Sequence, residues 1–213
     1  MNEPLPPIDV DDGPAGHILA VARNIAFQEY YSGLTMDRLA FALGMSKKTI
    51  YVHFPSKDAI FGAMIAATGA TIRREVTALL DGPGGFPEKL EGLLRIVSAH
   101  FGALQPGFLQ DLQRFAPHLS REIDALKEQN VPLLFTRVLR MGIEQGLVRA
   151  DLDLNFLTEY WLQVVKGIHD PAVLARTGLT PRQAFEKALD LLFRGLLTPA
   201  AQAPGRWGDP ASK

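Results

Sequence analysis

The sequence predicts an all-α protein, and two observations support this fold class. Apolar residues recur three or four positions apart in segment after segment, which is the spacing of one face of a helix. Ser, Thr or Asp stands before many of these segments, where a helix cap is needed, and Gly or Pro stands after them. The chain is therefore expected to be a succession of helices.

Composition narrows the class of protein. With 213 residues, 47% of them hydrophobic, the chain can bury a substantial core. The absence of cysteine excludes disulfides, thiolate metal sites and thiol nucleophiles, and it fits a reducing, cytoplasmic location, which we expect here. No apolar run reaches the roughly 18 residues that a membrane span needs, so no membrane partner is expected. A formal net charge of −1 argues against a general nucleic-acid coat, so any DNA binding must be local.

Two short helices joined by a tight turn are predicted within residues 34–57, behind a first helix from about residue 15 to residue 31. Thr35 can accept a hydrogen bond from the first turn of a helix that ends at Gly44, because glycine tolerates the left-handed backbone of a helix stop. Ser46 then caps a second helix after a turn of three to four residues. This arrangement is a helix-turn-helix.

The second of these short helices has a cationic and aromatic outer strip. Ile50 and Phe54 lie four apart and point inward, whereas the opposite side carries Lys47, Lys48 and Tyr51. The whole helix-turn-helix segment holds four Lys or Arg and one Asp, 4 − 1 = +3. A charge run is usually only a solvated face, and a helix-turn-helix can be purely structural. Here the cations stand at the start of the second helix, where recognition helices meet bases, so the segment is predicted to bind DNA.

At this point the run TIYVHFPSKDAI resembles the recognition-helix signature of the tetracycline-repressor (TetR/AcrR) family of transcriptional regulators. The resemblance is specific over about residues 16–66 and covers the remainder only in outline. It implies that phosphates are contacted by Thr35, Ser46, His53 and Lys57. It implies that bases are approached by Lys47, Lys48, Thr49 and Tyr51. Val52 departs from the family pattern, which often has a second aromatic there, and Lys48 stands where a small residue is common.

Helical patterns continue to residue 198. In the first helix Arg23 and Gln28 are expected to face solvent. Ser56 caps a long helix that ends at Asp81, and Thr180 begins a capping box with Gln183. The other predicted helices cover about residues 87–104, 108–115, 119–146, 154–168 and 181–196. Together with the resemblance, these patterns divide the chain into a disordered arm (1–13), a DNA-binding domain (14–60), a helical ligand-binding and dimerisation domain (61–198) and a disordered tail (199–213).

Aromatic side chains in the second domain form a candidate pocket for an apolar small molecule. The candidate lining residues are His100, Phe101, Phe108, Phe115, Phe135 and Trp161. Aromatics at helical spacing are also ordinary core residues, and the resemblance makes the pocket an equal alternative.

Apolar faces of the last two helices predict a dimer interface, as the resemblance also implies. The candidate interface residues are Trp161, Val165, Phe185, Leu189, Leu192 and Leu196. Gly167 and Gly195 would permit close helix approach. The alternative is an intramolecular helical hairpin without a dimer.

No catalytic or metal-binding pattern accompanies these features: the sequence lacks an HExxH motif, a nucleophile elbow and a phosphate-binding glycine loop. We therefore expect neither an enzyme nor a cofactor. The expected function is a homodimeric repressor, released from a palindromic double-stranded DNA operator by a small apolar or amphipathic effector. A constitutive DNA-binding protein without an effector, and less favoured a helical enzyme, are the alternatives.

Overall fold

The computed structural model describes residue 8 and residues 12–102 and 105–197. Its helices are α1 (Pro14–Gly33), α2 (Met36–Leu43), α3 (Lys47–His53), α4 (Lys57–Asp81), α5 (Phe86–Gly102), α6 (Pro106–Phe115), α7 (Pro117–Glu144), α8 (Leu154–Ile168), α9 (Pro171–Thr177) and α10 (Pro181–Leu196). In this part of the chain the extended backbone pairs only in an isolated bridge between Val148 and Leu197. The all-α prediction is confirmed. The predicted arm and tail lie almost wholly outside the described residues.

The helix signals around the predicted helix-turn-helix are confirmed. The Thr35 side chain accepts a hydrogen bond from the Arg38 N–H at 3.2 Å, and the Ser46 side chain accepts one from the Thr49 N–H at 3.1 Å. Gly44 has a φ of 61°, in the left-handed region that ends α2. These local contacts fix two short helices, α2 and α3, with a tight turn between them.

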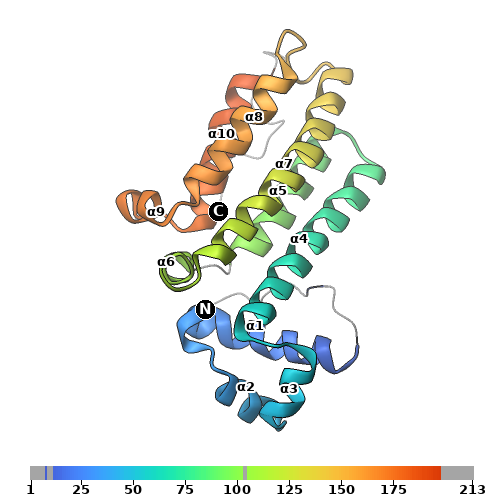
Figure 1. Cartoon of the computed structure of the whole chain (residues 1–213). Coiled ribbons are helices and arrows are strands. Elements are labelled where there is room, and N and C mark those ends of the chain that lie inside the picture. The colour runs from blue at the N-terminus through green and yellow to red at the C-terminus, as the bar shows by residue number, and fades with distance from the viewer. Residues whose placement is uncertain (1–7, 9–11, 103–104, 198–213) are drawn as a thin grey trace, which may run out of the picture.

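Two hydrophobic cores lie one above the other (Figure 1). The lower core joins α1, α2, α3 and the start of α4 to α6 and the start of α7; its fully buried members include Ile18, Leu39, Ile50 and Leu112. The upper core joins the end of α4 to α5, α7, α8 and α10. α4 has 25 residues and is about 37 Å long at a rise of 1.5 Å per residue, so it takes part in both cores.

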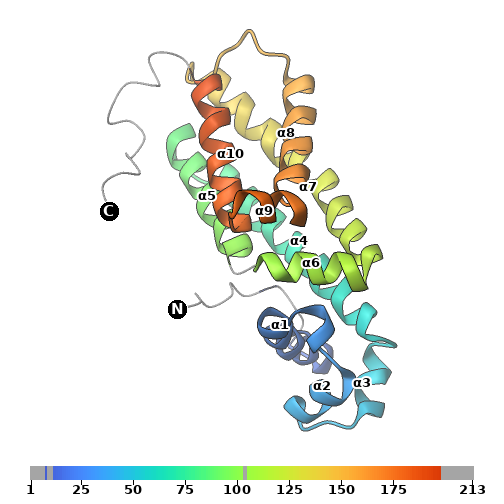
Figure 2. The same ribbon diagram turned by 90° about the vertical axis from the view of Figure 1, so that its left-hand side faces the viewer.

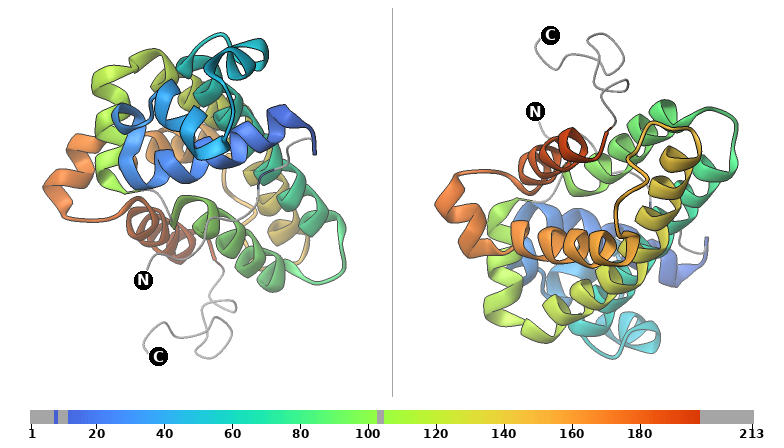
Figure 3. Two further views of the ribbon diagram at one scale, coloured as in Figure 1. Left: turned by 90° about the horizontal axis from the view of Figure 1, so that it is seen from below. Right: turned by 90° about the horizontal axis from the view of Figure 1, so that it is seen from above.

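The upper helices form a bundle in which α5 and α7 lie between α4 and the neighbouring pair α8 and α10 (Figure 1). α6 crosses the lower end of this bundle, next to α1 (Figure 2). Seen from below, α1, α2 and α3 cover that end (Figure 3). Among the described helices none is long and apolar enough to cross a membrane.

A short helix, α9, was not predicted. The predicted helix over residues 154–168 is followed at once by Asp170, which caps a new helix by accepting a hydrogen bond from the Ala172 N–H at 2.9 Å. Gly178 ends it with a φ of 66°. Seven residues are too few to show a 3.6-residue period, so only the caps could have indicated it.

The end of α1 leaves the helical conformation and lies against α6. Tyr30 has a φ of 64°, in the left-handed region that is unusual for a residue other than glycine. Its ring lies against Gly107, where a Cβ atom would come within 2.9 Å of the ring. The backbone N–H and the hydroxyl of Ser32 donate to the Asp111 carboxylate, at 2.7 and 2.9 Å.

Polar contacts also tie the end of α1 to α4, and α4 to α7. The Tyr31 hydroxyl donates to Asp58 Oδ1 at 2.6 Å, and His118 Nε2 lies 3.0 Å from Asp58 Oδ2. Burial, and then the bond to Asp58, raise the pKa of Tyr31 to about 12. The residues Tyr30 to Ser32, with their contacts to α4 and α6, are called the α1 junction below.

Candidate functional site

The outer face of α3 is open to solvent. Ile50 is fully buried in the lower core and fixes the orientation of the helix. The exposed residues of α3 are Lys47, Lys48, Thr49, Tyr51, Val52 and His53. A short helix with one buried anchor therefore presents most of its side chains outward, as an element entering a DNA groove must.

The two adjacent lysines of this face differ in their surroundings. Lys47 Nζ lies 2.8 Å from Asp37 Oδ1, and this bond raises the pKa of Lys47. Within the described part of the chain Lys48 forms no ion pair. Thr49 and Ser46 share a hydroxyl hydrogen bond of 2.8 Å, so Ser46 both caps α3 and orients Thr49. Lys48 is therefore the cation most available to a partner.

Lys57 is placed differently from the other predicted DNA contacts. Its ammonium donates to the Tyr31 carbonyl oxygen at 3.1 Å and lies 3.8 Å from the centre of the Tyr31 ring. Partial burial lowers its pKa. In this structure Lys57 stabilises the α1 junction, and it would have to leave Tyr31 to reach a phosphate.

Two exposed apolar side chains lie on or beside α3, and of these Phe41 was not singled out in the sequence, whereas Val52 was noted there as a departure from the family pattern. Phe41 on α2 is 89% exposed and Val52 is 75% exposed. In the sequence, Phe41 stands outside the apolar stripe of α2, and this position could have indicated that its side chain is exposed. Both side chains lie at the same end of the molecule as the cationic face.

A cavity of about 220 Å³ lies between the two cores. Its wall takes residues from α1, α4, α5, α6, α7, α8 and α10. At the end next to α1 the wall includes Arg23, Ala26, Phe27, Phe61 and Phe108, and among the upper helices it includes Leu134, Phe135, Trp161, Phe185 and Leu189. Phe135 and Trp161 stack with ring centres 5.5 Å apart. Most of the wall is apolar, as is usual for small-molecule sites.

Four of the six residues predicted to line a pocket lie in this wall. His100, Phe108, Phe135 and Trp161 line the cavity. Phe115 does not: it is the last residue of α6 and is 52% exposed, with the Arg114 guanidinium 5.2 Å from its ring centre. The side chain of Phe101 lies outside the described residues.

Arg23 was expected to face solvent, and this prediction is wrong. The residue is 7% exposed, lines the cavity, and lies with its guanidinium 5.7 Å from the centre of the Phe27 ring. Burial lowers its pKa. Arg23 lies on the apolar face of α1, at helical spacing from Leu19, Ala22 and Ala26. This spacing indicated that Arg23 is buried, whereas its charge suggested exposure.

Further polar residues in the wall were missed. Asn130 Nδ2 donates to the Gly69 carbonyl oxygen at 3.1 Å, and the predicted His100 has its Nε2 3.0 Å from Glu75 Oε2. His169 also lines the cavity; burial, and then the charge of Lys127, lower its pKa to about 4. These side chains give an otherwise apolar cavity a few polar points.

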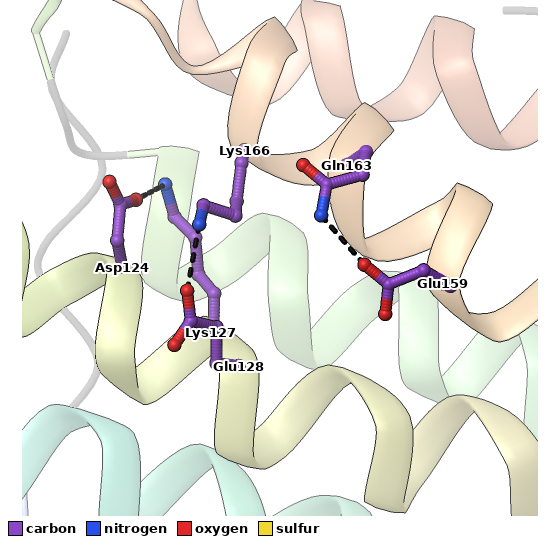
Figure 4. A network of polar contacts seen from close by, with 6 residues as sticks. All are labelled: Asp124, Lys127, Glu128, Glu159, Gln163 and Lys166. Carbon is purple, nitrogen blue, oxygen red and sulfur yellow. Dashed lines mark hydrogen bonds and ion pairs between the residues drawn. The ribbon is translucent and has the colours of Figure 1, made fainter.

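An ion pair links α7 to α8 beside the cavity, and contacts within each of the two helices lie next to it (Figure 4). Lys127 Nζ lies 3.0 Å from Asp124, and Lys166 of α8 reaches Glu128 of α7 at 2.8 Å, which raises the pKa of Lys166. A smaller hollow of about 90 Å³ lies here and shares Lys127 and His169 with the cavity wall. The outer side of the cavity is thus polar.

Comparison with known proteins places this geometry in a family. Residues 18–64 match the family model described as "Bacterial regulatory proteins, tetR family". The DNA-binding segment of this chain is a tetR-family domain. It is similar to the HTH-type transcriptional regulator YvaF of Bacillus subtilis (23% identical over 180 residues, 84% of this chain and 93% of that protein). It is also similar to the nucleoid occlusion factor SlmA of Glaesserella parasuis (28% identical over 178 residues, 78% of this chain and 83% of that protein).

Solved structures agree with this tetR-family fold. The reduced form of NemR from E. coli superposes with a TM-score of 0.64 over 86% of this chain and 96% of that chain, at 18% identity. At such identity the likeness concerns the fold alone. The family model describes regulatory proteins and YvaF is named as a transcriptional regulator, and the chain is accordingly a tetR-family transcriptional regulator with a DNA-binding helix-turn-helix.

In this tetR-family chain the predicted dimer-interface residues are mostly core. The members buried within the single chain, at 3–6% exposure, are Trp161, Val165, Phe185, Leu189 and Leu196. Leu192 is partly buried against the same core. Five of the six predicted residues are therefore covered by their own chain, which corrects their assignment to a surface between two chains, while the assignment of Leu192 stays a prediction. The apolar faces of α8 and α10 are covered by α5 and α7 and by one another, which periodicity alone cannot distinguish from a partner chain.

The outer side of α8 and α10 nevertheless carries exposed apolar groups. Phe156 is 70% exposed, Tyr160 is 49% exposed and stacks on Phe156 at 6.3 Å, and Leu191 is 73% exposed. A Cβ atom added at Gly167 or Gly195 would meet no atom within 4 Å. This set of residues is called the α8–α10 outer face below.

Proposed function

We propose that this chain is a homodimeric repressor that binds a palindromic DNA operator and leaves it when a small apolar or amphipathic molecule enters the cavity. The observation that carries the proposal is the composition of the cavity wall. Arg23, Ala26 and Phe27 belong to α1, which packs on the recognition helix α3, while the rest of the wall belongs to the helices above. An occupant would therefore touch both parts of the molecule at once.

α4 gives the occupant a second connection to the DNA-facing end. It begins three residues after α3 ends, and Phe61, Met64 and Thr68 on its lower half line the cavity. An effector that favours one position of α4 would change the spacing of two recognition helices in a dimer. It would weaken DNA binding only by the difference between its affinities for the two spacings.

The proposed DNA contacts follow the exposure of α3. Lys48, Thr49 and Tyr51 approach bases, with Lys47 after it leaves Asp37. Phosphates are contacted by Thr35, Ser46 and His53, and by Lys57 if it leaves Tyr31. In a bacterial cell the proposed place of action is the cytoplasm, where the operator lies.

The proposed homodimer forms through the α8–α10 outer face. One recognition helix seldom binds DNA specifically enough, so a symmetric pair is expected on a palindrome. Leu191→Asp should give a folded monomer, because an unpaired carboxylate cannot be buried against a second chain. Leu133→Asp is the matched control: Leu133 is 50% exposed on α7 and should leave a dimer intact. Light scattering and circular dichroism of both variants test the assignment, and a dimeric Leu191→Asp variant would refute it.

DNA recognition can be tested with a pool of duplexes of random sequence. The duplexes that the full chain selects from this pool should share an inverted repeat, and Lys48→Ala should select no shared sequence. Small molecules can then be titrated against the bound duplex, followed by fluorescence anisotropy. If the selected sequences lacked two-fold symmetry, the palindromic operator would be contradicted. If compounds filled the cavity and none of them released the DNA, the chain would instead be a constitutive DNA-binding protein.

A further inference from the structure

Two buried polar atoms in the cavity wall lack a hydrogen-bond partner in the structure: Asn130 Oδ1 and His100 Nδ1. Asn130 is 9% exposed and His100 is 4% exposed. Buried polar atoms in folded proteins are nearly always hydrogen-bonded, so a molecule in the cavity would meet two atoms to which the described residues give no partner.

The existing bonds of both side chains determine what that molecule must offer. Asn130 donates through Nδ2 to the Gly69 carbonyl oxygen, so the amide atom left over is the oxygen, an acceptor. His100 Nε2 faces the Glu75 carboxylate at 3.0 Å. An ionised carboxylate only accepts, so Nε2 carries a hydrogen, and Nδ1 is an acceptor whenever the ring carries that one hydrogen alone. The Asn130 oxygen therefore needs a donor, and a hydroxyl group, which both donates and accepts, can also pair with His100 Nδ1.

We propose that the cavity binds a largely apolar molecule with a hydroxyl group that donates to Asn130 Oδ1 or His100 Nδ1. This inference rests on the proposed function, because it specifies the effector of the same cavity. The stacked rings of Phe135 and Trp161 and the rest of the apolar wall would receive the hydrocarbon part. A hydroxyl group also accepts hydrogen bonds, so it can pair with the wall in more than one orientation.

A carboxylate is the competing occupant. Arg23 and Lys127 line the same cavity and would attract an anion, and none of its described lining residues is Asp or Glu. The unpaired Asn130 oxygen argues against that choice, since an ionised carboxylate brings no donor. Lys127 is moreover bonded to Asp124 at 3.0 Å.

Three probes of similar size separate these occupants: octan-1-ol, 1-methoxyheptane and octanoate. The alcohol and the ether have the same number of heavy atoms and differ in the O–H donor. Binding is followed in the full chain by the fluorescence of Trp161, with Trp207→Phe removing the second indole. Octan-1-ol should bind about tenfold more tightly than 1-methoxyheptane, since the ether leaves the acceptors unpaired. Equal affinities, tighter binding of octanoate, or binding of none of the three would overturn the proposal.

A variant locates the preference. Asn130→Leu should reduce the alcohol-to-ether ratio while it keeps binding of the ether. Asn155→Leu, the same change at an exposed position of α8, should leave the ratio unchanged. Should Asn130→Leu fail to fold, the alcohol-to-ether ratio of the chain with Asn130 intact still decides the matter. A ratio that survives in folded Asn130→Leu and in His100→Leu would overturn the assignment of these two acceptors.

Operator release distinguishes this inference from the proposed function. If the ether releases operator DNA as well as the alcohol does, the effector-responsive regulator stands and the hydroxyl preference fails. If the alcohol binds preferentially but never changes DNA affinity, the hydroxyl site stands and effector control fails.

Discussion

The DNA-facing end and the cavity differ in how their residues come together. In the helix-turn-helix, Thr35, Gly44 and Ser46 act on backbone groups within a few residues of themselves. In the cavity, Arg23 and Leu189 belong to helices at opposite ends of the chain and share a wall only because α1 and α10 are packed on the same bundle. Local chemistry determines the first region, and long-range packing determines the second.

This difference predicts unequal sensitivity to substitution. A face made of exposed side chains on a short capped helix can change its residues with little effect on stability, and its changes should appear in DNA binding. A wall made of buried side chains should show its changes in the free energy of unfolding.

The largest effect is expected for Phe61→Ala. Phe61 is 1% exposed, packs edge-on against Tyr31 at 4.9 Å and lines the cavity, so truncation should lower the free energy of unfolding by about 3–5 kcal/mol. Phe41→Ala is the control, because Phe41 is 89% exposed and should change stability by less than about 0.5 kcal/mol. Urea denaturation measures both, and equal losses would contradict the division into a packed wall and an open face.

Acid should destabilise the chain through His169. Its pKa in the folded chain is about 4, against an ordinary 6.5, because burial disfavours the charged ring. As the pH falls from 6.5 towards 4 the unfolded chain takes up a proton that the folded chain does not, so stability falls by up to about 3 kcal/mol. His169→Gln should remove that part of the pH dependence, whereas His53→Gln on exposed α3 should keep it. If the free energy of unfolding of His169→Gln changed with pH as steeply as that of the parent chain, His169 would not be the source of the acid sensitivity.

A moderate effect on DNA binding, with none on folding, is expected for Lys48→Ala. If Lys48 donates to a guanine, its loss should cost about 1–3 kcal/mol per half-site on a selected duplex and little on a scrambled one. Lys47→Ala should act more weakly, because Lys47 is already paired with Asp37. Titrations at several salt concentrations make the comparison, and uniform weakening on both duplexes would move Lys48 from base reading to phosphate binding.

The smallest effect is expected for the cap of α3. Ser46→Ala removes the acceptor for the Thr49 N–H and should lower stability by about 1 kcal/mol. Ser46→Asp keeps a capping oxygen but adds a negative charge, so it should retain stability and lose DNA affinity at low salt. If the aspartate variant bound DNA as well as the parent chain, Ser46 would lie away from the phosphates.

The same contrast explains how far sequence reasoning reached. Caps and stops around α2, α3 and α10 were predicted because Ser46 and Thr180 act on their own helices. The cavity was predicted only in part. Phe115 and Phe135 are both aromatic residues at helical spacing, so the sequence does not distinguish them. Only the packed bundle shows that Phe115 is exposed and Phe135 is buried.

Arg23 and Leu189 show two further ways in which local patterns mislead. Arg23 stands on the apolar face of α1 and is buried. It was assigned to solvent because its charge was given more weight than its position in the helical pattern. The spacing of Leu189 correctly predicted burial, yet it could not say whether its own chain or a second one would cover it. Both questions are settled only by the packed structure, in which Arg23 lines the cavity and Leu189 belongs to the upper core.

The α1 junction has a mechanical consequence for the DNA-binding end. Tyr30 and Ser32 attach α1 to Gly107 and Asp111 of α6, and Tyr31 attaches it to Asp58 at the start of α4. A body fixed at two separate points cannot swing in every direction; it can turn only about the line that joins them. Because α6 contributes Phe108 to the cavity wall and α4 contributes Phe61, both pivots of that axis lie on helices that an occupant would touch.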